Sequence, residues 1–258
     1  MGVGFRPLTT LAWATFRGSL SGAKGIGLII GALLPTFVII GLVAHGISGN
    51  DLVSAYELLV GELFLPMILL IIALLLAVPL FREEIDQQSL SYLLTRTIGK
   101  PAIVLGKYLG YVLVAYAILL PSVVVSYGIV AIWGSPPAGI LNGVLPALLV
   151  STALGILAYG AIYLFLGLVT RSALIIGLIY AFVWEYLIGG LSGLAPDLSI
   201  MHYLMSLPAL WVSQGPLSQY STNLVLWQVI AAPIIFAGAL LFLTILIFWD
   251  FGFIPSPD

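Results

Sequence analysis

The stretch LFLPMILLIIALLLAVPLF at residues 63–81 contains no charged and no amide side chain. A helix that crosses about 30 Å of hydrocarbon needs about 20 residues of this kind. The apolar residues follow one another without a break, whereas the strands of an outer-membrane barrel alternate apolar and polar residues. The stretch therefore predicts an α-helix that spans a membrane.

Five more apolar stretches of comparable length lie outside this segment. They cover residues 25–47, 108–132, 145–169, 173–191 and 225–249. The composition agrees, because 62% of the 258 residues are hydrophobic and only 7% are charged, whereas soluble domains contain roughly 25% charged residues. We therefore predict an all-α integral membrane protein with six transmembrane helices, formed by a single domain over residues 1–258.

The positive charges predict the orientation of these helices. All eight Lys and Arg residues fall in one set of end segments, residues 1–24, 82–107, 170–172 and 250–258. The opposite set contains none of them and covers residues 48–62, 133–144 and 192–224. Cytoplasmic loops carry an excess of Lys and Arg. We therefore expect both termini in the cytoplasm and a multi-pass protein of the cell (plasma) membrane.

The composition also argues against several classes of function. Eight cations spread over a chain with a net charge of −2 do not form a nucleic-acid footprint. The absence of cysteine excludes disulfides, zinc–thiolate sites and thiol nucleophiles. His45 and His202 are the only histidines, and no second strong ligand lies near His202 in the sequence. We expect no enzyme activity, no metal site and no cofactor in this chain, since no motif of a zinc protease or serine hydrolase occurs.

Two segments outside the predicted spans have an unusual apolar pattern. In residues 5–24, apolar side chains recur at three- and four-residue steps, at Leu8, Leu11, Ala12, Phe16 and Leu20. This spacing predicts a helix that lies in the inner interface, and the alternative is a disordered tether. Residues 192–224 are apolar for an outer loop and are interrupted by Pro208 and Pro216, which favours re-entrant or interfacial helices between spans five and six. We expect Ser199 to cap one of these helices and His202 to lie on its polar side.

Glu185 is the only charged residue within the predicted span 173–191. An isolated carboxylate is costly in a bilayer, so we expect Glu185, with Tyr186 and His202, to mark a substrate pathway or gate. The alternative is a carboxylate that reaches the outer interface between Trp184 and Tyr186. Glu57 and Glu62, before the second span, are expected to be helix-end charges.

The longest predicted cytoplasmic segment is residues 82–107. Its middle reads as a short amphipathic helix. The apolar side chains on one side are Ile85, Leu90, Leu93 and Leu94, and the polar side chains largely opposite are Glu84, Gln87, Gln88 and Ser91. Gly99 and Pro101 end this helix, and a second helix runs from Pro101 into the third span. A partner that pushes the short helix would move spans two and three. The alternative is an interfacial helix with a structural role only.

This loop resembles that of ATP-binding-cassette (ABC) transporter permeases of the type-2 exporter membrane family. The resemblance rests on a charged exit from the second span, a Ser-Leu-x-x-Leu-Leu helix, and a Gly-Lys start of the third span. The matching residues are Arg82, Glu83, Glu84, Ser89, Leu90, Leu93, Leu94, Ile98, Lys100, Gly106 and Lys107. The chain departs from the pattern at Gln88, where a glycine is usual, and at Thr97, where a proline is usual, and these departures concern the point at which the helix breaks. The layout of the whole chain is also similar to that family.

The resemblance implies a permease subunit that pairs with a second permease, the same or homologous, and with two copies of a cytoplasmic ABC ATPase. Residues 82–107 would then be the coupling loop, and the short helix within it, at about Asp86–Thr95, would be the coupling helix that docks on the ATPase. Contacts with the ATPase would come from Arg82, Glu83, Glu84, Asp86, Gln87, Leu90, Leu93, Leu94 and Arg96. No pattern G-x-x-x-x-G-K-[ST] occurs in the chain, so ATP and Mg would be bound by the ATPase. An apolar or lipid-like substrate would suit the predicted path for export better than a bare ion. The alternative function is a self-powered secondary transporter or channel with six spans.

Overall fold

The apolar stretch 63–81 lies within one continuous helical segment, Gly49–Asp86, which is 38 residues long. In this computed structural model, the segment comprises α4 (Gly49–Leu58), the π-helical η1 (Leu59–Leu69), α5 (Leu70–Ala77) and α6 (Pro79–Asp86). At roughly 1.5 Å per residue its length is on the order of 55 Å, which exceeds a bilayer of about 40–45 Å with its headgroups. Both ends of the segment can therefore extend beyond a membrane.

The structure describes residues 5–20, 23–86, 99–134, 138–188, 198–212, 215–220, 222 and 224–250. Within these ranges all regular secondary structure is helical and no strand is present, which confirms the all-α prediction. Besides Gly49–Asp86, three helices are long and apolar enough to cross a membrane, and they lie within α8 (Lys100–Trp133), α9 (Ala138–Val169) and α12 (Leu226–Asp250). The described part of the chain therefore contains four helices that are long and apolar enough to span a membrane.

The other two predicted spans are less regular. The first corresponds to α2 (Ala23–Ala32) and α3 (Leu34–Ala44), which are bent by 46° where they meet and pass as a span only if they are counted together. The fifth corresponds to α10 (Ala173–Ile179) and η2 (Tyr180–Ile188), whose apolar part is too short to be counted as a span. The structure thus supports four spans, or five with the bent pair, and the sixth stays a prediction.

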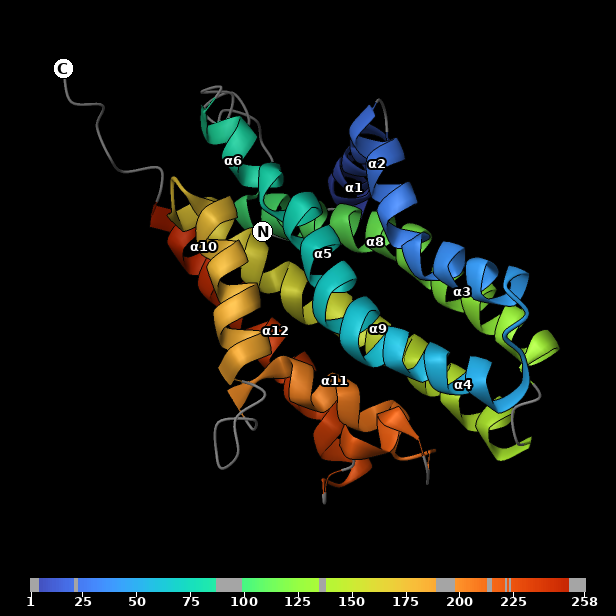
Figure 1. The fold of residues 1–258 in the computed structure, drawn as a ribbon. Helices are drawn as coiled ribbons and strands as arrows, with labels where there is room; N and C mark the ends of the chain where they lie inside the picture. The colour runs from blue at the N-terminus through green and yellow to red at the C-terminus, as the bar shows by residue number, and fades with distance from the viewer. Residues whose placement is uncertain are drawn as a thin grey trace.

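The bundle has two chemically different ends (Figure 1). At one end lie α6, the starts of α2 and α8, the end of α12 and the turn between α9 and α10. We call it the cationic end, because Lys24, Arg82, Lys100, Lys107 and Arg171 lie in these elements. At the opposite end lie α4, α11 (Ile200–Ala209) and the 3₁₀ helix η4 (Pro216–Tyr220). We call it the acidic end, after the four carboxylates of α4, η1 and η2, which are Asp51, Glu57, Glu62 and Glu185.

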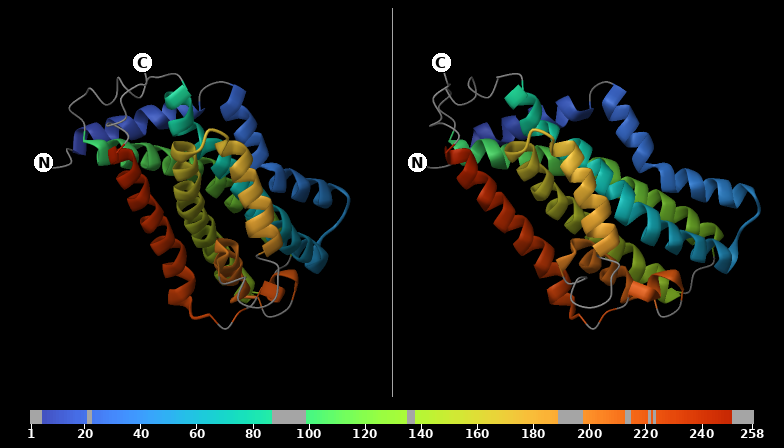
Figure 2. Two further views of the ribbon diagram at one scale, coloured as in Figure 1. Left: turned by 90° about the vertical axis from the view of Figure 1, so that its left-hand side faces the viewer. Right: turned by 60° about the vertical axis from the view of Figure 1, so that its left-hand side comes forward.

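The N-terminal helix α1 (Phe5–Leu20) crosses the cationic end at a large angle to α12 (Figure 2). It packs along α8, with Ala12 buried and Phe16 half-buried against the core, whereas Trp13 is exposed. A helix is therefore present over Phe5–Leu20, within the predicted range 5–24, and the alternative of a disordered tether is wrong for these residues. A helix across the ends of the bundle agrees with the predicted interfacial position.

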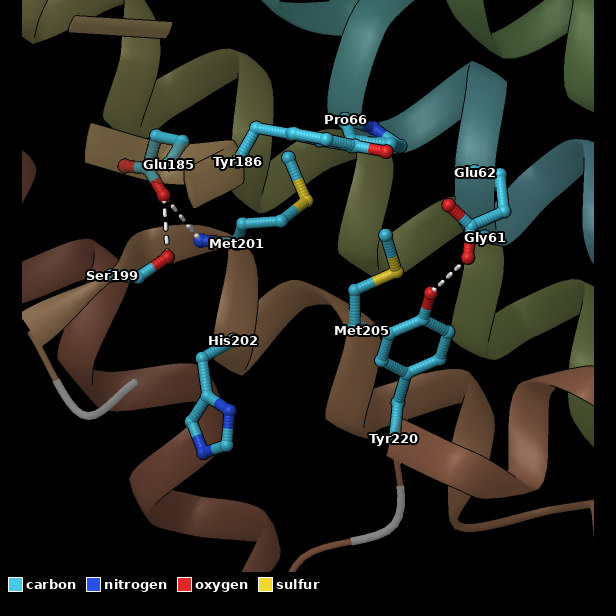
Figure 3. A pocket seen from close by; sticks show the side chains of 10 residues that line it. All are labelled: Gly61, Glu62, Pro66, Glu185, Tyr186, Ser199, Met201, His202, Met205 and Tyr220. Atoms are coloured by element: carbon cyan, nitrogen blue, oxygen red, sulfur yellow. Dashed lines mark hydrogen bonds between the residues drawn. The ribbon is translucent and has the colours of Figure 1, made fainter. Parts of the chain in front are cut away.

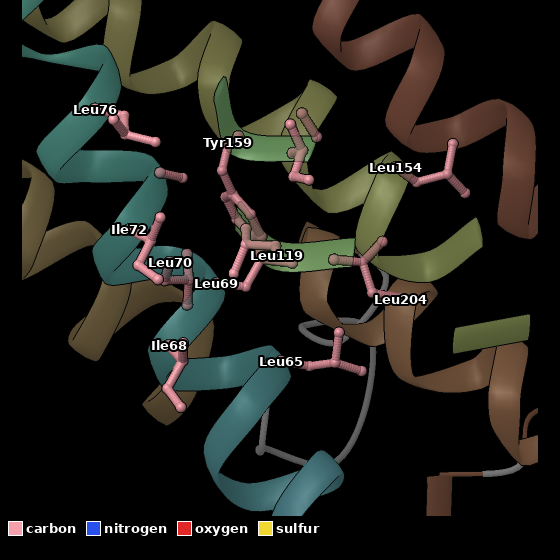
Figure 4. Packing of buried hydrophobic residues seen from close by; sticks show 14 of the residues in the cluster. Leu65, Ile68, Leu69, Leu70, Ile72, Leu76, Leu119, Leu154, Tyr159 and Leu204 are labelled. Carbon is pink, nitrogen blue, oxygen red and sulfur yellow. The ribbon is translucent and has the colours of Figure 1, made fainter. Parts of the chain in front are cut away.

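Helix α9 is the centre of the packing. Within the apolar part of α9, Gly143–Val169, 72% of the most apolar 18-residue stretch is buried inside the protein. The corresponding share in α12 is 17%. Figure 4 shows Leu154 and Tyr159 of α9 enclosed by side chains of η1, α5, α8 and α11. Large apolar side chains of α10 and α12, such as Ile175 and Ile235, are exposed instead. An apolar surface of this kind is expected where a helix contacts lipid.

Tyrosine hydroxyls join α8 to α9. Three tyrosines of α8 donate to main-chain carbonyl oxygens of α9, Tyr108 to Leu157 at 2.8 Å, Tyr111 to Ile156 at 3.0 Å and Tyr116 to Ala153 at 3.4 Å. Polar contacts between membrane helices stabilise by about 0.6 kcal/mol each on average. The sequence patterns did not predict this set of contacts, because a tyrosine in an apolar run does not reveal its partner.

Gly167 sets the close approach of α9 to the junction of α5 and α6. A Cβ atom at this position would lie 2.6 Å from the carbonyl oxygen of Val78, which is a backbone atom and cannot rotate away. We expect Gly167→Ala to lower the free energy of unfolding by about 1–3 kcal/mol, as measured by thermal or denaturant unfolding in detergent. Gly128→Ala is the control, since no atom lies within 4 Å of its added Cβ. Equal stability of the two variants would contradict this packing.

Candidate functional site

A pocket of about 320 Å³ lies at the acidic end (Figure 3). Its walls come from the two π-helical segments η1 and η2 and from α11 and η4. The lining residues are Gly61, Glu62, Pro66, Glu185, Tyr186, Ser199, Met201, His202, Met205 and Tyr220. The pocket thus joins two helices of the membrane bundle to the segment that follows the fifth predicted span.

The two π-helical segments have an irregular backbone at the pocket wall. Segment η1 contains Pro66, which has no N–H group and cannot make the regular α-helical hydrogen bond. π-Helical turns are rare in proteins, but those that do occur are often found at functional sites. In this protein they place Gly61 and Glu62 of η1, and Glu185 and Tyr186 of η2, on the pocket wall.

Glu185 is buried, with 2% of its surface exposed. Its carboxylate accepts hydrogen bonds from the hydroxyls of Tyr180 at 2.5 Å and Ser199 at 2.6 Å, and from the backbone N–H of Met201 at 3.1 Å. The N–H of Met201 is a donor and both hydroxyls can donate, so the surroundings supply three donors to this carboxylate. Donors inside the protein therefore satisfy the Glu185 carboxylate, and its position relative to a membrane interface stays a prediction.

Glu185 also replaces the expected cap of α11. Ser199 occupies the N-cap position as predicted, but its side chain makes no capping bond to its own helix. Instead the Ser199 hydroxyl donates to Glu185, and the same carboxylate oxygen accepts from Met201 in the first turn of α11. The predicted cap by the Ser199 side chain is wrong, because a carboxylate from η2 is a stronger acceptor for these groups.

Glu57 and Glu62 accept hydrogen bonds from η4, the helical segment that follows α11 at the acidic end. Glu57 is buried and its Oε2 accepts from the backbone N–H of Leu217 at 3.3 Å. Gly215 allows this approach, since it has a φ of +125° and an added Cβ would lie against the Glu57 carboxylate. Glu62 accepts from the Tyr220 hydroxyl at 2.7 Å. Burial, followed by this hydrogen bond to Glu62, raises the pKa of Tyr220, so its hydroxyl remains a donor.

The expectation that Glu57 and Glu62 are helix-end charges is therefore wrong. The helical segment that contains the second predicted span begins at Gly49 and not near residue 63, so both carboxylates lie well inside it. Donor groups of η4 form hydrogen bonds with these carboxylates. The helix can therefore extend beyond the apolar stretch on its N-terminal side. The prediction from hydropathy stopped where the apolar residues stopped.

The structure brings the three predicted gate residues together. Glu185, Tyr186 and His202 come from η2 and α11 and all line the pocket. Pocket residues that the sequence analysis missed are Glu62, Met201, Met205 and Tyr220. A signal for Glu62 was available, because residues 48–62 contain three carboxylates and no Lys or Arg. Over the described ranges, no group of His, Cys, Asp and Glu is arranged to hold a metal ion.

An aromatic cluster lies directly behind Glu185. The ring of Tyr163 stacks on Tyr159 at 6.3 Å and meets Tyr180 edge-on at 6.4 Å, and Tyr180 donates to Glu185. The hydroxyl of Tyr163 is buried and has no hydrogen-bond partner among the described residues, and the buried hydroxyl of Tyr159 lies near the Glu185 carboxylate. A buried hydroxyl without a partner is unusual in a packed interior, so the polar character of the site continues from Glu185 into the bundle.

The cationic end contains part of the predicted ATPase contact. In α6, Arg82 pairs with Asp86 within the helix, Glu83 pairs with Lys24 of α2 at 3.0 Å, and Glu84 pairs with Lys107 of α8 at 2.5 Å. The other predicted contact residues lie outside the described residues, and they are Gln87, Leu90, Leu93, Leu94 and Arg96.

Lys107 is the buried member of this charged group, with 4% of its surface exposed. Its ammonium contacts the Glu84 carboxylate, donates to the carbonyl oxygen of Leu80 and lies 4.9 Å from the centre of the Phe81 ring. It also lines a second pocket, of about 440 Å³, between α1, α2, α5, α6 and α8. Lys107 thus fixes α6 to α8 where the chain leaves the bundle.

No protein-family model matches the chain, and no curated protein sequence is significantly similar to it. The loop motif, the helical architecture and the two charged ends are therefore the features from which a function can be inferred.

Proposed function

We propose that this chain is the transmembrane permease subunit of an ABC transporter that exports a substrate across the cell membrane. The observation that carries the proposal is the continuous segment Gly49–Asp86. One part of it, η1, forms a wall of the pocket at the acidic end, and its last part, α6, carries the first charged residues of the predicted coupling loop. A movement imposed on the loop has a direct helical connection to the pocket.

The ion pairs of α6 support this role. Val78 separates α5 from α6, which begins at Pro79, so the direction of α6 depends on its side-chain contacts as well as on the helix backbone. Those contacts are the pairs of Glu83 with Lys24 and of Glu84 with Lys107. A partner that docks on the loop would act on α6, and through these pairs on α2 and α8.

The proposed topology places the cationic end in the cytoplasm. The described Lys and Arg residues of α2, α6 and α8 lie at that end, where the positive-inside rule expects them. In this arrangement both termini are cytoplasmic, α2 with α3 forms the first of six spans, and α10 with η2 forms part of the fifth. Helices α11 and η4 are then the re-entrant outer segment. Two permease copies, identical or homologous, would enclose the substrate path.

ATP hydrolysis belongs to a separate ATPase subunit in this proposal, with two copies per transporter. We expect the chain to copurify with its ATPase and to change the ATPase rate in liposomes. Leu93→Asp should reduce the copurified ATPase by about tenfold or more, because a charge in the apolar side of the coupling helix removes a central contact. Ser91→Asp adds the same charge on the side predicted to lie largely opposite and should bind the ATPase normally. Transport and ATPase association unaffected by Leu93→Asp would overturn the proposal.

A self-powered secondary transporter is the second candidate. Two observations favour it: the 46° bend between α2 and α3, and the buried carboxylate of Glu185. Broken helices and intramembrane carboxylates are common in ion-coupled transporters. The two candidates differ in their energy source. Uptake into inside-out vesicles that requires ATP and survives collapse of the ion gradients supports the ABC permease, and the opposite result supports the secondary transporter.

A further inference from the structure

The pocket at the acidic end is lined by two carboxylates, and His202 is the one described lining residue that can carry a positive charge. Glu62 and Glu185 both line it, and the sequence contains no Lys or Arg in residues 48–62, 133–144 and 192–224. The partners of the Glu185 carboxylate are two hydroxyls and one backbone N–H. These groups stabilise the charge but do not cancel it. The pocket is therefore a region of negative potential, and such regions concentrate cations.

The other walls of the pocket are apolar, aromatic or polarizable. Tyr186 and Tyr220 contribute aromatic rings, and Met201 and Met205 contribute thioether side chains. Aromatic faces attract organic cations, and methionine adapts to apolar surfaces of different shape. The volume of about 320 Å³ lies at the lower end of the range of roughly 300–1,000 Å³ for small-molecule pockets. A bare metal ion would not use these walls.

We propose that this pocket binds a small amphipathic organic cation, with an ammonium or phosphonium group on an apolar body. The positive group lies near Glu62 and Glu185, and the apolar body packs against Met201 and Met205. The role of this cation as the transported substrate rests on the function proposed above. Its binding does not, because the pocket is formed by this chain alone.

Glu62 is the residue that gives the clearest test. It is exposed, and within the described part of the chain it takes part in one hydrogen bond, from Tyr220. Glu62→Gln removes the charge and keeps an oxygen that can accept from Tyr220. Asp51→Asn is the matched control, because Asp51 is an exposed carboxylate of the same helical segment at the same end but does not line the pocket. Both variants remove one negative charge from the acidic end.

The experiment uses the full chain in nanodiscs of neutral lipid, without any ATPase. Radiolabelled tetraphenylphosphonium is the probe in equilibrium dialysis, and tetraphenylborate has the same shape with the opposite charge. We expect saturable binding of the cation, above that to empty nanodiscs, and none of the anion. Glu62→Gln should weaken cation binding by about tenfold, and Asp51→Asn by less than about twofold.

Tyr186→Leu is a second variant, because it removes an aromatic wall and leaves the contacts of Glu62 and Glu185 with the outer helices intact. It should weaken cation binding by about threefold to tenfold. Equal binding of both probes, no saturable binding, or equal effects of Glu62→Gln and Asp51→Asn would overturn the inference. Loss of ATPase copurification would leave this result untouched, and failure of cation binding would leave the coupling proposal untouched.

Discussion

Glu185→Ala is expected to release α11 from η2 and to speed amide hydrogen exchange in Ile200–Ala209 by about 100-fold. The substitution leaves three buried or part-buried donors without their acceptor, the hydroxyls of Tyr180 and Ser199 and the N–H of Met201. Each such group costs roughly 1–3 kcal/mol. A total of about 3 kcal/mol corresponds to about 100-fold in an opening equilibrium. The loss is local, since the apolar packing of the bundle does not involve this carboxylate.

Hydrogen exchange with mass spectrometry in nanodiscs measures this opening directly. Glu185→Gln should give a smaller increase, because its carbonyl oxygen still accepts, but its NH₂ group faces donors. Glu83→Ala is the control, since Glu83 is an exposed carboxylate at the opposite end of the bundle. The proposed cap is incorrect if exchange in α11 is as slow in Glu185→Ala as in the parent protein.

Lys107→Ala is expected to lower the free energy of unfolding by about 3 kcal/mol or more. The substitution removes the ammonium that pairs with Glu84, donates to the Leu80 carbonyl and lies over the Phe81 ring. The Glu84 carboxylate, whose side chain is 28% exposed, would be left without this cation near the core of the bundle. Truncating one member of a buried pair costs more than the pair itself contributes.

Lys24→Ala is the matched control for this measurement. Its pair with Glu83 is at the surface, with side-chain exposures of 85% and 53%, and such pairs contribute about 0–1 kcal/mol. Denaturant unfolding in mixed micelles should separate the two variants clearly. The double variant Lys107→Met with Glu84→Gln should recover part of the loss, because it leaves no unpaired charge. Similar losses for Lys107→Ala and Lys24→Ala would show that the pair with Glu84 is not buried in the protein.

The helical class could be predicted from the sequence because the length of an apolar run and the positions of the charges are properties of the local sequence. The runs at residues 63–81 and 225–249 are long enough to require a helix in lipid, whatever surrounds them. The start of the second helix at Gly49 could not be found in this way. Its first turns carry carboxylates, and their cost depends on donors of η4 far along the chain. The π-helical form of η1, which contains Pro66, likewise cannot be read from composition.

The candidate site could be predicted only in part for the same reason. Glu185 was recognisable, because a charge within an apolar run is costly by itself. Its neighbours were not, since Glu62 meets Tyr220 across 158 residues and Glu57 meets Leu217 across 160. No periodicity relates such positions. Only the return of the chain to the acidic end after η2 brings them together.

The tyrosine contacts between α8 and α9 have a consequence for how the chain assembles. They join residues 37 to 49 positions apart, so two consecutive helices can pair as a hairpin soon after both enter the membrane. The contacts of Glu57 and Glu62 with η4 span more than three times that distance and can form only after the chain has returned to the acidic end. We therefore expect the hairpin to form before the walls of the pocket, which require η4. An error in the synthesis of the later part of the chain would thus leave a stably inserted hairpin with an incomplete pocket.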